Sequence, residues 1–449
     1  MMRRQVMTTL GNHRMRLMCA LFLLAASFAA QAERSPNVVL ILSDDAGFAD
    51  FSFQGSRSMR TPHIDSIAAE GVRFAQGYVS ASVCSPSRAG LITGRYQQRF
   101  GHEHNFPAKS EDHVGLPLSE RTLADALGGA GYHTIAMGKW HLGYGAQLHP
   151  GKRGFDDFYG FLQGSRSYRP HEGTPRNRLQ RNGEYLLESF DYMTDHLGAE
   201  AVRYIETCKD KPFFLYLSFN AVHSPMQALR SDLKQVVGET VPKRKKLAAM
   251  TASMDRAVGL VLAALEEQRL EKDTLVIFVN DNGGAWNNAA NNAPLRGTKG
   301  TPFEGGLRVP FLMRWPGVLP AGTTYEHPVS TLDIFATALA AAGGKRSEKR
   351  PLDGVDLVPF VRGENDAQAH EALFWRRKQN HAARVGDWKL VVYKGSDPML
   401  FNIASDMKEE TDLAATHPQI VARLSKRYAS WEAEMIDPLW GSSAVDPKD

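Results

Sequence analysis

One short segment of this chain combines a cysteine, an arginine and the signals that begin and end a helix. The segment starts at Cys84 and reads C-S-P-S-R-A-G-L-I-T-G-R. Ser85 could cap a helix, Pro86 is tolerated in a first turn where its missing N–H is not needed, and Gly94 suits a C-terminal cap. Cys84 would then lie at the positive end of the helix dipole, about one turn before Arg88, which favours a thiolate and a bound anion. This pattern predicts a nucleophile beside an anion-binding helix terminus, with a structural cysteine near a turn as the alternative.

Two pairs of polar residues follow apolar runs that are typical of buried strands. Asp44 and Asp45 come after the first run, and Asp281 and Asn282 come after another. Three carboxylates and an amide oxygen suit a hard divalent cation such as Ca²⁺ or Mg²⁺. Each pair alone could be an ordinary turn, because Asp, Asn and Gly favour turns. Both pairs together, at the ends of two buried strands, favour a metal site.

Three further segments carry basic or imidazole side chains. Lys139 and His141 are two residues apart, so in an extended segment both side chains face the same side, where two cationic groups could meet an anion. His223 follows a third apolar run, and Lys299 lies in a glycine-rich segment. Each of these residues taken singly is more often structural than catalytic.

The elements that must position these residues alternate between buried strands and amphipathic helices. Four apolar runs predict strands, at residues 37–42, 134–137, 212–219 and 274–279. Helical patterns separate them, for example at residues 122–129, 195–207 and 246–268. The alternation predicts an α/β fold with a large, mostly parallel central sheet flanked by helices. In such sheets the ligand site lies at the carboxyl ends of the strands, where all four polar segments are found.

The character of the sequence changes after residue 345. A polar, charged stretch at 343–350 is followed by short β-type segments and then by a helical pattern at 418–435. We therefore predict a catalytic domain over residues 33–345 and a small α+β subdomain over residues 346–449, an antiparallel sheet packed on one helix.

Residues 1–32 have the pattern of a secretory signal peptide. Four arginines precede an apolar stretch, and Ala30-Gln31-Ala32 is a typical cleavage site. Cleavage after Ala32 predicts a secreted or periplasmic protein with no membrane segment in its mature form. The mature chain would keep 49 basic and 49 acidic residues, so its charge gives no support to a nucleic-acid partner. Cys19 would leave with the leader, and Cys208 would have no partner once Cys84 is modified.

The Cys84 segment resembles the signature of the formylglycine-dependent sulfatases, C-x-P-S-R followed by L-x-T-G-R, a family of the alkaline phosphatase superfamily. The G-K-W-H-L-G segment around Lys139 and the segment L-R-G-T-K-G-T-P-F-E-G-G-L-R-V-P around Lys299 resemble further motifs of that family. His223 is similar to the histidine of its P-H-x-P motif, although Val222 stands where proline is usual, a departure that concerns the loop backbone. The residues that follow Arg95 are similar to those of bacterial secreted polysaccharide sulfatases.

This resemblance implies a modified nucleophile and one metal ion. In the family a maturation enzyme oxidises the cysteine to formylglycine (3-oxoalanine), so a formylglycine-generating enzyme is an implied partner and Cys84 an implied precursor. The implied metal is Ca²⁺, with Mg²⁺ as the other candidate. Its implied ligands are Asp44, Asp45, Asp281, Asn282 and the group made from Cys84.

The resemblance also implies a role for each remaining site residue. Arg88, Lys139 and Lys299 would stabilise charge on the sulfate, and Asp281 would take a proton from the attacking hydroxyl. His223, helped by Lys299, would protonate the leaving alcohol. A covalent sulfated intermediate would form, and His141 would then remove the proton that allows sulfate to leave.

The expected substrate is a sulfated carbohydrate, either a polysaccharide such as a sulfated galactan or its oligosaccharides. His104 and Asn105 could meet sugar hydroxyls, and Trp286 could stack on a sugar ring, although each could equally be a packing or loop residue. Three arginines in an apparent insertion could reach further anionic groups or form a solvated basic loop: Arg166, Arg169 and Arg176.

Other functions fit the same fold class. An arylsulfatase, or a phosphoester or phosphonate hydrolase of the superfamily, is the main alternative, and a non-catalytic carbohydrate-binding relative is another. No residue pattern indicates the sugar, the position of its sulfate, exo or endo action, or an oligomeric state.

Overall fold

The computed structural model describes residues 35–106 and 110–441, and the predicted signal peptide lies outside these residues. The chain from Pro36 onward forms one compact unit. The predicted division between residues 345 and 346 stays a prediction.

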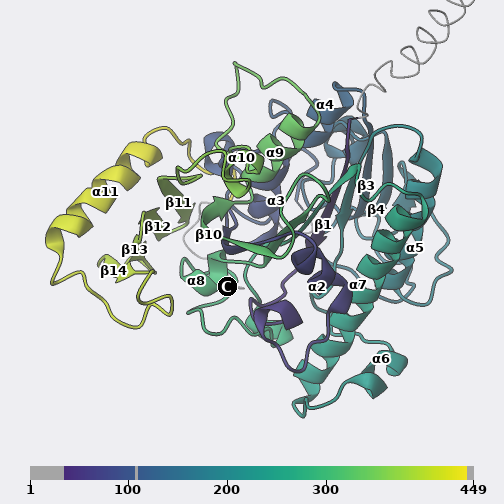
Figure 1. Ribbon diagram of the computed structural model, residues 1–449, viewed down its shortest axis with the longest axis horizontal. Helices are drawn as coiled ribbons and strands as arrows, with labels where there is room; N and C mark the ends of the chain where they lie inside the picture. Colours follow the sequence, from purple (N-terminus) through teal and green to yellow (C-terminus); the bar gives the residue numbers. More distant parts are fainter. Residues whose placement is uncertain (1–34, 107–109, 442–449) are drawn as a thin grey trace, which may run out of the picture. The chain divides into compact units, whose positions relative to one another are not determined.

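A central sheet of ten strands carries the site-bearing loops (Figure 1). Its strand order is β10-β2-β9-β8-β1-β7-β3-β4-β5-β6. The four strands predicted from apolar runs are the neighbours β8, β1, β7 and β3, and they run parallel to one another. Their carboxyl ends therefore share one edge of the sheet. The bounds are β1 Asn37–Ser43, β2 Val72–Tyr78, β3 His133–Lys139, β4 Asp157–Phe161, β5 Gln180–Arg181, β6 Glu184–Tyr185, β7 Phe213–Ser218, β8 Thr274–Asn280, β9 Phe311–Arg314 and β10 Thr323–Ser330.

Helices cover both faces of this sheet, as the side chains of β1 show. Val38, Leu40 and Leu42 belong to one hydrophobic core, and the alternate residues Val39 and Ile41 belong to a second. The first core includes α3 (Cys84–Thr93), α4 (Leu123–Gly128) and α9 (Asp333–Ala341). The second includes α2 (Pro62–Ala69), α5 (Met193–Cys208) and α7 (Pro242–Glu267), of which α5 and α7 lie side by side in Figure 1. The predicted α/β fold is thus confirmed.

The remaining short helices lie in connections or in the C-terminal part. They are α6 (Arg230–Gln235), α8 (Glu304–Leu307), α10 (Val358–Val361) and the 3₁₀ helices η1 (Ser52–Gln54), η2 (Gln97–Phe100), η3 (Ala146–Leu148), η4 (Pro150–Lys152) and η5 (Trp286–Asn288). Among the helices of the described residues, α7 alone is long and apolar enough to cross a membrane, but 72% of its apolar window is buried within the protein. Its burial is that of a core helix.

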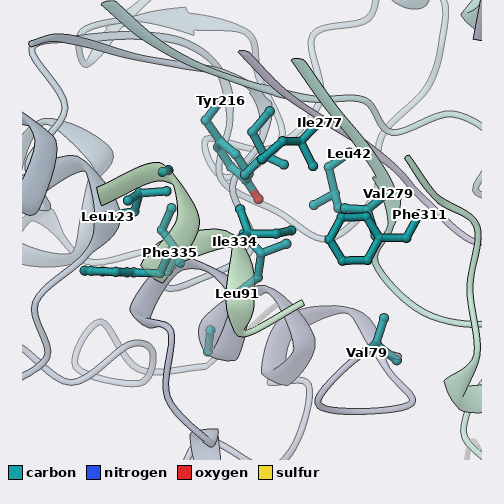
Figure 2. Close-up of a cluster of buried hydrophobic side chains, with 14 of the residues drawn as sticks. Leu42, Val79, Leu91, Leu123, Tyr216, Ile277, Val279, Phe311, Ile334 and Phe335 are labelled. Carbon is teal, nitrogen blue, oxygen red and sulfur yellow. The ribbon is translucent and has the colours of Figure 1, made fainter. Parts of the chain in front are cut away.

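Residues of the first core pack α3 against one face of the sheet. Figure 2 shows Leu91 of α3 and Ile334 of α9 close to strand residues that include Leu42 and Ile277. Every residue of α3 is buried. Because α3 begins at Cys84, this packing fixes the position of the cysteine relative to the carboxyl ends of the strands.

A second, antiparallel sheet forms the C-terminal part, as predicted. It contains β11 (Ala372–Arg377), β12 (Asn380–Val385), β13 (Trp388–Val392) and β14 (Met399–Asn402), in that order. The helix α11 (Pro418–Glu432) packs on β12 and β13. Lys389 of β13 forms buried ion pairs with Glu304 of α8, at 2.8 Å, and with Glu409, at 3.0 Å. These contacts connect the small sheet to the segment that carries Lys299.

Candidate active site

The helix α3 begins at Cys84 beside the loop that follows β1. The Cys84 Sγ lies 3.6 Å from Asp44 Oδ1. Gly94 ends the helix in the left-handed conformation, as predicted, with φ of 65°. Ser85 was expected to cap the helix, and this was wrong, because Ser85 is already inside the first turn. The capping acceptor comes from elsewhere in the chain: Asn105 Oδ1 accepts the Ser85 N–H at 2.9 Å.

The Cys84 side chain is a thiol rather than a thiolate. Burial raises its pKa to about 12, although Lys139 and Lys299 act in the opposite direction. The expected thiolate was therefore wrong, because a side chain that is 1% exposed loses more hydration than the helix terminus and two lysines return. An unmodified Cys84 is consequently a poor nucleophile at neutral pH.

The two predicted carboxylate pairs meet at the edge of the sheet. Asp44 and Asp45 follow β1, Asp281 and Asn282 follow β8, and the last residues of these parallel strands are register partners. All four side chains are buried, and Asn282 Nδ2 donates to Asp45 Oδ1 at 2.8 Å. Asp45 has a positive φ of 62°, which is rare for a residue other than glycine and turns its side chain out of the strand alternation.

Three cations balance the three carboxylates. Arg88 Nη2 lies 2.8 Å from Asp281. Lys139 Nζ lies 2.6 Å from Asp44. Burial alone would raise the pKa of Asp45, but Lys299, at 2.6 Å, and then His223 lower that pKa overall. Three ion pairs therefore hold the buried carboxylates together.

The donor set fits a divalent cation. Ligand atoms of Asp44, Asp45, Cys84 and His223 all lie within 4.8 Å of one another. Asn282 Oδ1 is buried and accepts no hydrogen bond from the described residues. An unpaired buried amide oxygen is costly, and a cation would satisfy it together with the carboxylates. The carboxylate oxygens of Asp44 and Asp45 and the amide oxygen of Asn282 are ligands that suit Ca²⁺ or Mg²⁺.

Lys139 and His141 converge on this cluster, but not through strand alternation. Lys139 is the last residue of β3, and His141 has a positive φ of 56°, so the chain turns between them. Burial, and then Lys139 and Arg88, lower the pKa of His141 well below its ordinary value. The ring is therefore neutral and can accept a proton. Its Nδ1 is buried without a hydrogen-bond partner among residues 35–106 and 110–441.

His223 and Lys299 lie on the more open side of the cluster. His223 Nδ1 donates to the Ser224 carbonyl at 2.6 Å, which leaves Nε2, 3.5 Å from Asp45, to hold or release a proton. Lys299 Nζ lies 3.0 Å from Cys84 Sγ. The Ala221–Val222 peptide bond, where the sequence departs from the usual motif, is cis. The structure thus brings all the predicted catalytic and metal-binding residues into one cluster.

The predicted sugar contacts have different surroundings. His104 is 5% exposed, and its carbonyl accepts the Trp440 Nε1–H at 3.0 Å. Asn105 is exposed, and its Oδ1 accepts the Ser85 N–H at the start of α3. Trp286 is 79% exposed and is the one exposed tryptophan among the described residues. Trp286 and Asn105 are therefore exposed and His104 is buried, and contact of these residues with a sugar stays a prediction.

The three arginines of the predicted basic loop form contacts within the protein. Arg166 is 3% exposed and pairs with Glu188 at 2.7 Å. Arg169 donates to the Asp191 carbonyl at 3.0 Å. The guanidinium of Arg176 lies 4.5 Å from the centre of the Tyr144 ring. A solvated loop was wrong for Arg166, because the ion pair and two aromatic neighbours enclose it.

One supporting residue was missed. Asn288 lies in η5, and its Nδ2 donates to the backbone carbonyls of Asp45 and Val222, both at 3.1 Å. It therefore joins three loops of the site and fixes the turn that carries Trp286. The local sequence gives no signal for this role, because Asn288 is one of several asparagines in a turn-like stretch.

A family model described as "Sulfatase" matches residues 36–344. The chain belongs to the sulfatase family. It is a sulfuric ester hydrolase by this membership and by its curated relatives. It is 36% identical over 385 residues to the N-acetylgalactosamine-6-sulfatase of Mus musculus, covering 80% of this chain and 72% of that protein. It is 31% identical over 462 residues to Arylsulfatase J of Mus musculus, covering 89% and 76%.

A solved structure shares both the fold and the sequence similarity. The sulfatase fold of Ps i-CgsB in complex with k-i-k-neocarrahexaose superimposes with a TM-score of 0.87 and 36% identity, covering 91% of this chain and 95% of that chain. The match extends beyond the region of the family model, so the C-terminal sheet belongs to the shared architecture.

Proposed function

We propose that this sulfatase removes sulfate from a sulfated carbohydrate, a polysaccharide or its oligosaccharides, by means of a formylglycine made from Cys84. The observation that carries the proposal is the position of Cys84 Sγ, 3.6 Å from Asp44 and 3.0 Å from Lys299, inside a cluster of three carboxylates and three cations. Two relatives named after sugar sulfates or crystallised with a saccharide support the substrate class.

The modified residue and the metal would supply chemistry that the unmodified chain lacks. The hydrate of a formylglycine at position 84 would supply one hydroxyl as the nucleophile for sulfur and a second hydroxyl whose deprotonation would allow sulfate to leave. One Ca²⁺, or else Mg²⁺, held by Asp44, Asp45, Asp281 and Asn282, would orient the sulfate and stabilise its charge.

Side chains of the protein would stabilise charge and transfer protons in this reaction. Arg88, Lys139 and Lys299 place fixed positive charge where negative charge collects during the reaction. His223 Nε2 donates a proton to the leaving alcohol, since its Nδ1 is held by the Ser224 carbonyl. The neutral His141 ring accepts the proton whose removal allows sulfate to leave.

Removal of the nucleophile tests the reaction. Cys84→Ser, made in cells without a serine-competent maturation enzyme, should lose sulfate release on the order of 10⁴- to 10⁶-fold, the range for loss of a catalytic nucleophile or its partner. Mass spectrometry of the Cys84 peptide in the parent protein should show the aldehyde. Full turnover by the serine variant with no aldehyde present would contradict the mechanism.

Trp286 is proposed to stack on the sugar ring beside the sulfate. Trp286→Ala should raise KM for a sulfated oligosaccharide about tenfold, equivalent to 1.4 kcal/mol of binding. It should leave hydrolysis of a small aryl sulfate unchanged. A screen over sulfated saccharides, an aryl sulfate and an aryl phosphate provides the comparison, and preference for the aryl sulfate or the phosphate would favour the arylsulfatase or phosphoesterase alternative instead.

We also propose that the protein acts outside the cytoplasm, secreted or periplasmic, after cleavage behind Ala32, and that its partner during maturation is a formylglycine-generating enzyme. The leader-like residues 1–32 support the first proposal. The intact signature at Cys84 supports the second.

A further inference from the structure

The chain near its C-terminal end returns to the catalytic domain and lies against a loop beside the active site. After α11, the Ile436 N–H donates to the Gln98 carbonyl at 3.1 Å, and the Leu439 N–H donates to the Gly101 carbonyl at 2.9 Å. Arg376 of β11 donates to the Ile436 carbonyl at 2.6 Å. We call residues 436–440 the C-terminal clasp, because backbone hydrogen bonds attach it at two points to the segment before Phe106.

The side chain of Trp440 contacts this loop from the C-terminal clasp. Its Nε1–H donates to the His104 carbonyl at 3.0 Å. Its ring meets the His102 ring edge to face, with 4.7 Å between centroids, and meets Phe106 at 6.1 Å. The hydrogen bond fixes the distance between the Trp440 ring and the loop. The aromatic contacts fix the orientation of the loop relative to that ring.

The same loop supports the first turn of α3. His102 Nε2 lies 2.7 Å from Ser85 Oγ, and Asn105 Oδ1 accepts the Ser85 N–H at 2.9 Å. Ser85 directly follows Cys84 and has no capping partner within its own helix, since Val83 provides none. The loop therefore supplies the cap that this helix end lacks.

The loop also holds the backbone of His141. Ser85 Oγ donates to the His141 carbonyl at 2.8 Å, and the Phe106 ring lies 5.2 Å from the His141 ring. His141 has a φ of 56°, which is uncommon for a residue other than glycine and is held by surrounding contacts. Ser85 and Phe106 are such contacts, and both depend on the position of the loop from Gly101 to Phe106.

We propose that the C-terminal clasp is a positioning element of the active site, acting from Trp440 through His102 and Ser85 on the first turn of α3 and on His141. None of its residues touches the reacting atoms. The inference rests on the proposed function for its effect on turnover, but its effect on the structure of α3 does not require the modified cysteine.

The first test uses the full chain with Cys84 unmodified, and it measures hydrogen exchange of the peptide that contains the Ser85 amide. Trp440→Ala should speed exchange there about tenfold or more, equivalent to 1.4 kcal/mol, which lies within the range for loss of a helix cap. Trp440→Phe keeps the ring on His102 and should restore most of the protection. Leu439→Ser is the matched control, because the Leu439 side chain is 58% exposed.

The second test uses protein whose Cys84 peptide carries the aldehyde. Trp440→Ala should lower kcat at least about tenfold, with KM within about twofold of the parent value, because His141 and the nucleophile are displaced while the cationic contacts of the sulfate stay. Leu439→Ser should match the parent protein.

The two tests separate the inference from the proposed function. Faster exchange at Ser85 supports the clasp even in protein that releases no sulfate. Parent-like exchange at Ser85 in Trp440→Ala would overturn the inference, even if the protein is an active sulfatase. Equal losses in Leu439→Ser and Trp440→Ala would also overturn it, because the effect would then not pass through the Trp440 ring.

Discussion

Two buried clusters of opposite charges among the described residues differ in character, and one of them has the features of an active site. The first is the cluster around Cys84. The second, which we call the Glu304 network, comprises Tyr78, Glu304, Arg384, Lys389 and Glu409 and joins α8 to the C-terminal sheet. Both clusters combine carboxylates with cations, and most of these side chains are buried.

The clusters differ in how their polar atoms are satisfied. In the Glu304 network, one carboxylate oxygen of Glu304 pairs with Lys389, and the other accepts the Tyr78 hydroxyl at 2.6 Å. Glu409 Oε1 has no hydrogen-bond partner among the described residues, but it forms an ion pair with Lys389 at 3.0 Å. In the Cys84 cluster, Asn282 Oδ1 and His141 Nδ1 are buried with no hydrogen-bond partner among the described residues. Buried charge alone therefore does not mark a site in this protein. Polar atoms left without a partner beside that charge do, because a ligand can satisfy them.

The largest effect on stability is expected in the Glu304 network. Lys389→Met should lower the free energy of unfolding by about 3–5 kcal/mol, because it leaves the Glu304 and Glu409 carboxylates buried without their shared cation. Urea unfolding measures the change. Lys408→Met removes an exposed lysine beside Glu409 and should stay within about 0.5 kcal/mol of the parent. Equal losses in the two variants would remove the distinction between the network and ordinary surface charge.

The Cys84 cluster should respond to added metal, and the Glu304 network should not. At a Ca²⁺ concentration of 100 times Kd, the parent protein should gain about 2.7 kcal/mol of stability over the chelated protein. Lys389→Met should keep the same gain from its lower baseline, because the two clusters share no partner. Asp45→Asn should lose it. Thermal unfolding with EDTA, CaCl₂ or MgCl₂ measures these differences, and an unchanged gain in Asp45→Asn would place the metal elsewhere.

The smallest effect is a difference in pH dependence within the Glu304 network. Burial raises the pKa of Glu409 to about 7, from an ordinary value of 4.5. The folded state then binds more protons than the unfolded state between these values, so Glu409 makes the protein less stable as pH rises from 4.5 to 7. Burial opposes ionisation of Glu304 as well, but Lys389 and two arginines lower its pKa to about 2. The contribution of Glu304 to the stability of the folded protein is therefore lost only as pH falls below 4.5.

Glu409→Gln should remove the first effect and leave the second. The variant should therefore gain stability relative to the parent between pH 5 and pH 8, as measured by urea unfolding at both values. A constant difference between variant and parent across this range would show that Glu409 does not titrate there.

The fold could be predicted in its central part and not at its edges. The four apolar runs identified β1, β3, β7 and β8, because strands covered on both faces have a continuous apolar sequence that few other elements share. The strands β5 and β6, at one end of the sheet, contain two residues each, and such short strands carry no periodicity. The antiparallel strand β9 lies between β2 and β8, and its four residues likewise give no directional signal.

The site could be predicted where its residues follow strands, since parallel strands bring their carboxyl ends to one edge. Residues that act through long-range backbone contacts could not. Asn105 was expected to meet a sugar, and its additional role as the cap of a helix that starts 21 positions earlier was missed. Asn288 and His102 support the site through bonds that no local pattern indicates. The thiolate was expected from the helix terminus, and the extent of burial that reverses it is a property of the whole fold.

The burial of Cys84 also limits the time during which a modifying enzyme can reach this residue. An enzyme that oxidises this residue cannot reach it in the folded chain, where it is 1% exposed. One group that covers it, Lys299, lies 215 positions later in the sequence. At synthesis rates of roughly 5–20 residues per second, this interval corresponds to roughly 10–40 s during which Cys84 stays uncovered. The active fraction of a preparation would then be a ratio of two rates, oxidation and folding, and chains that fold first would stay as thiols.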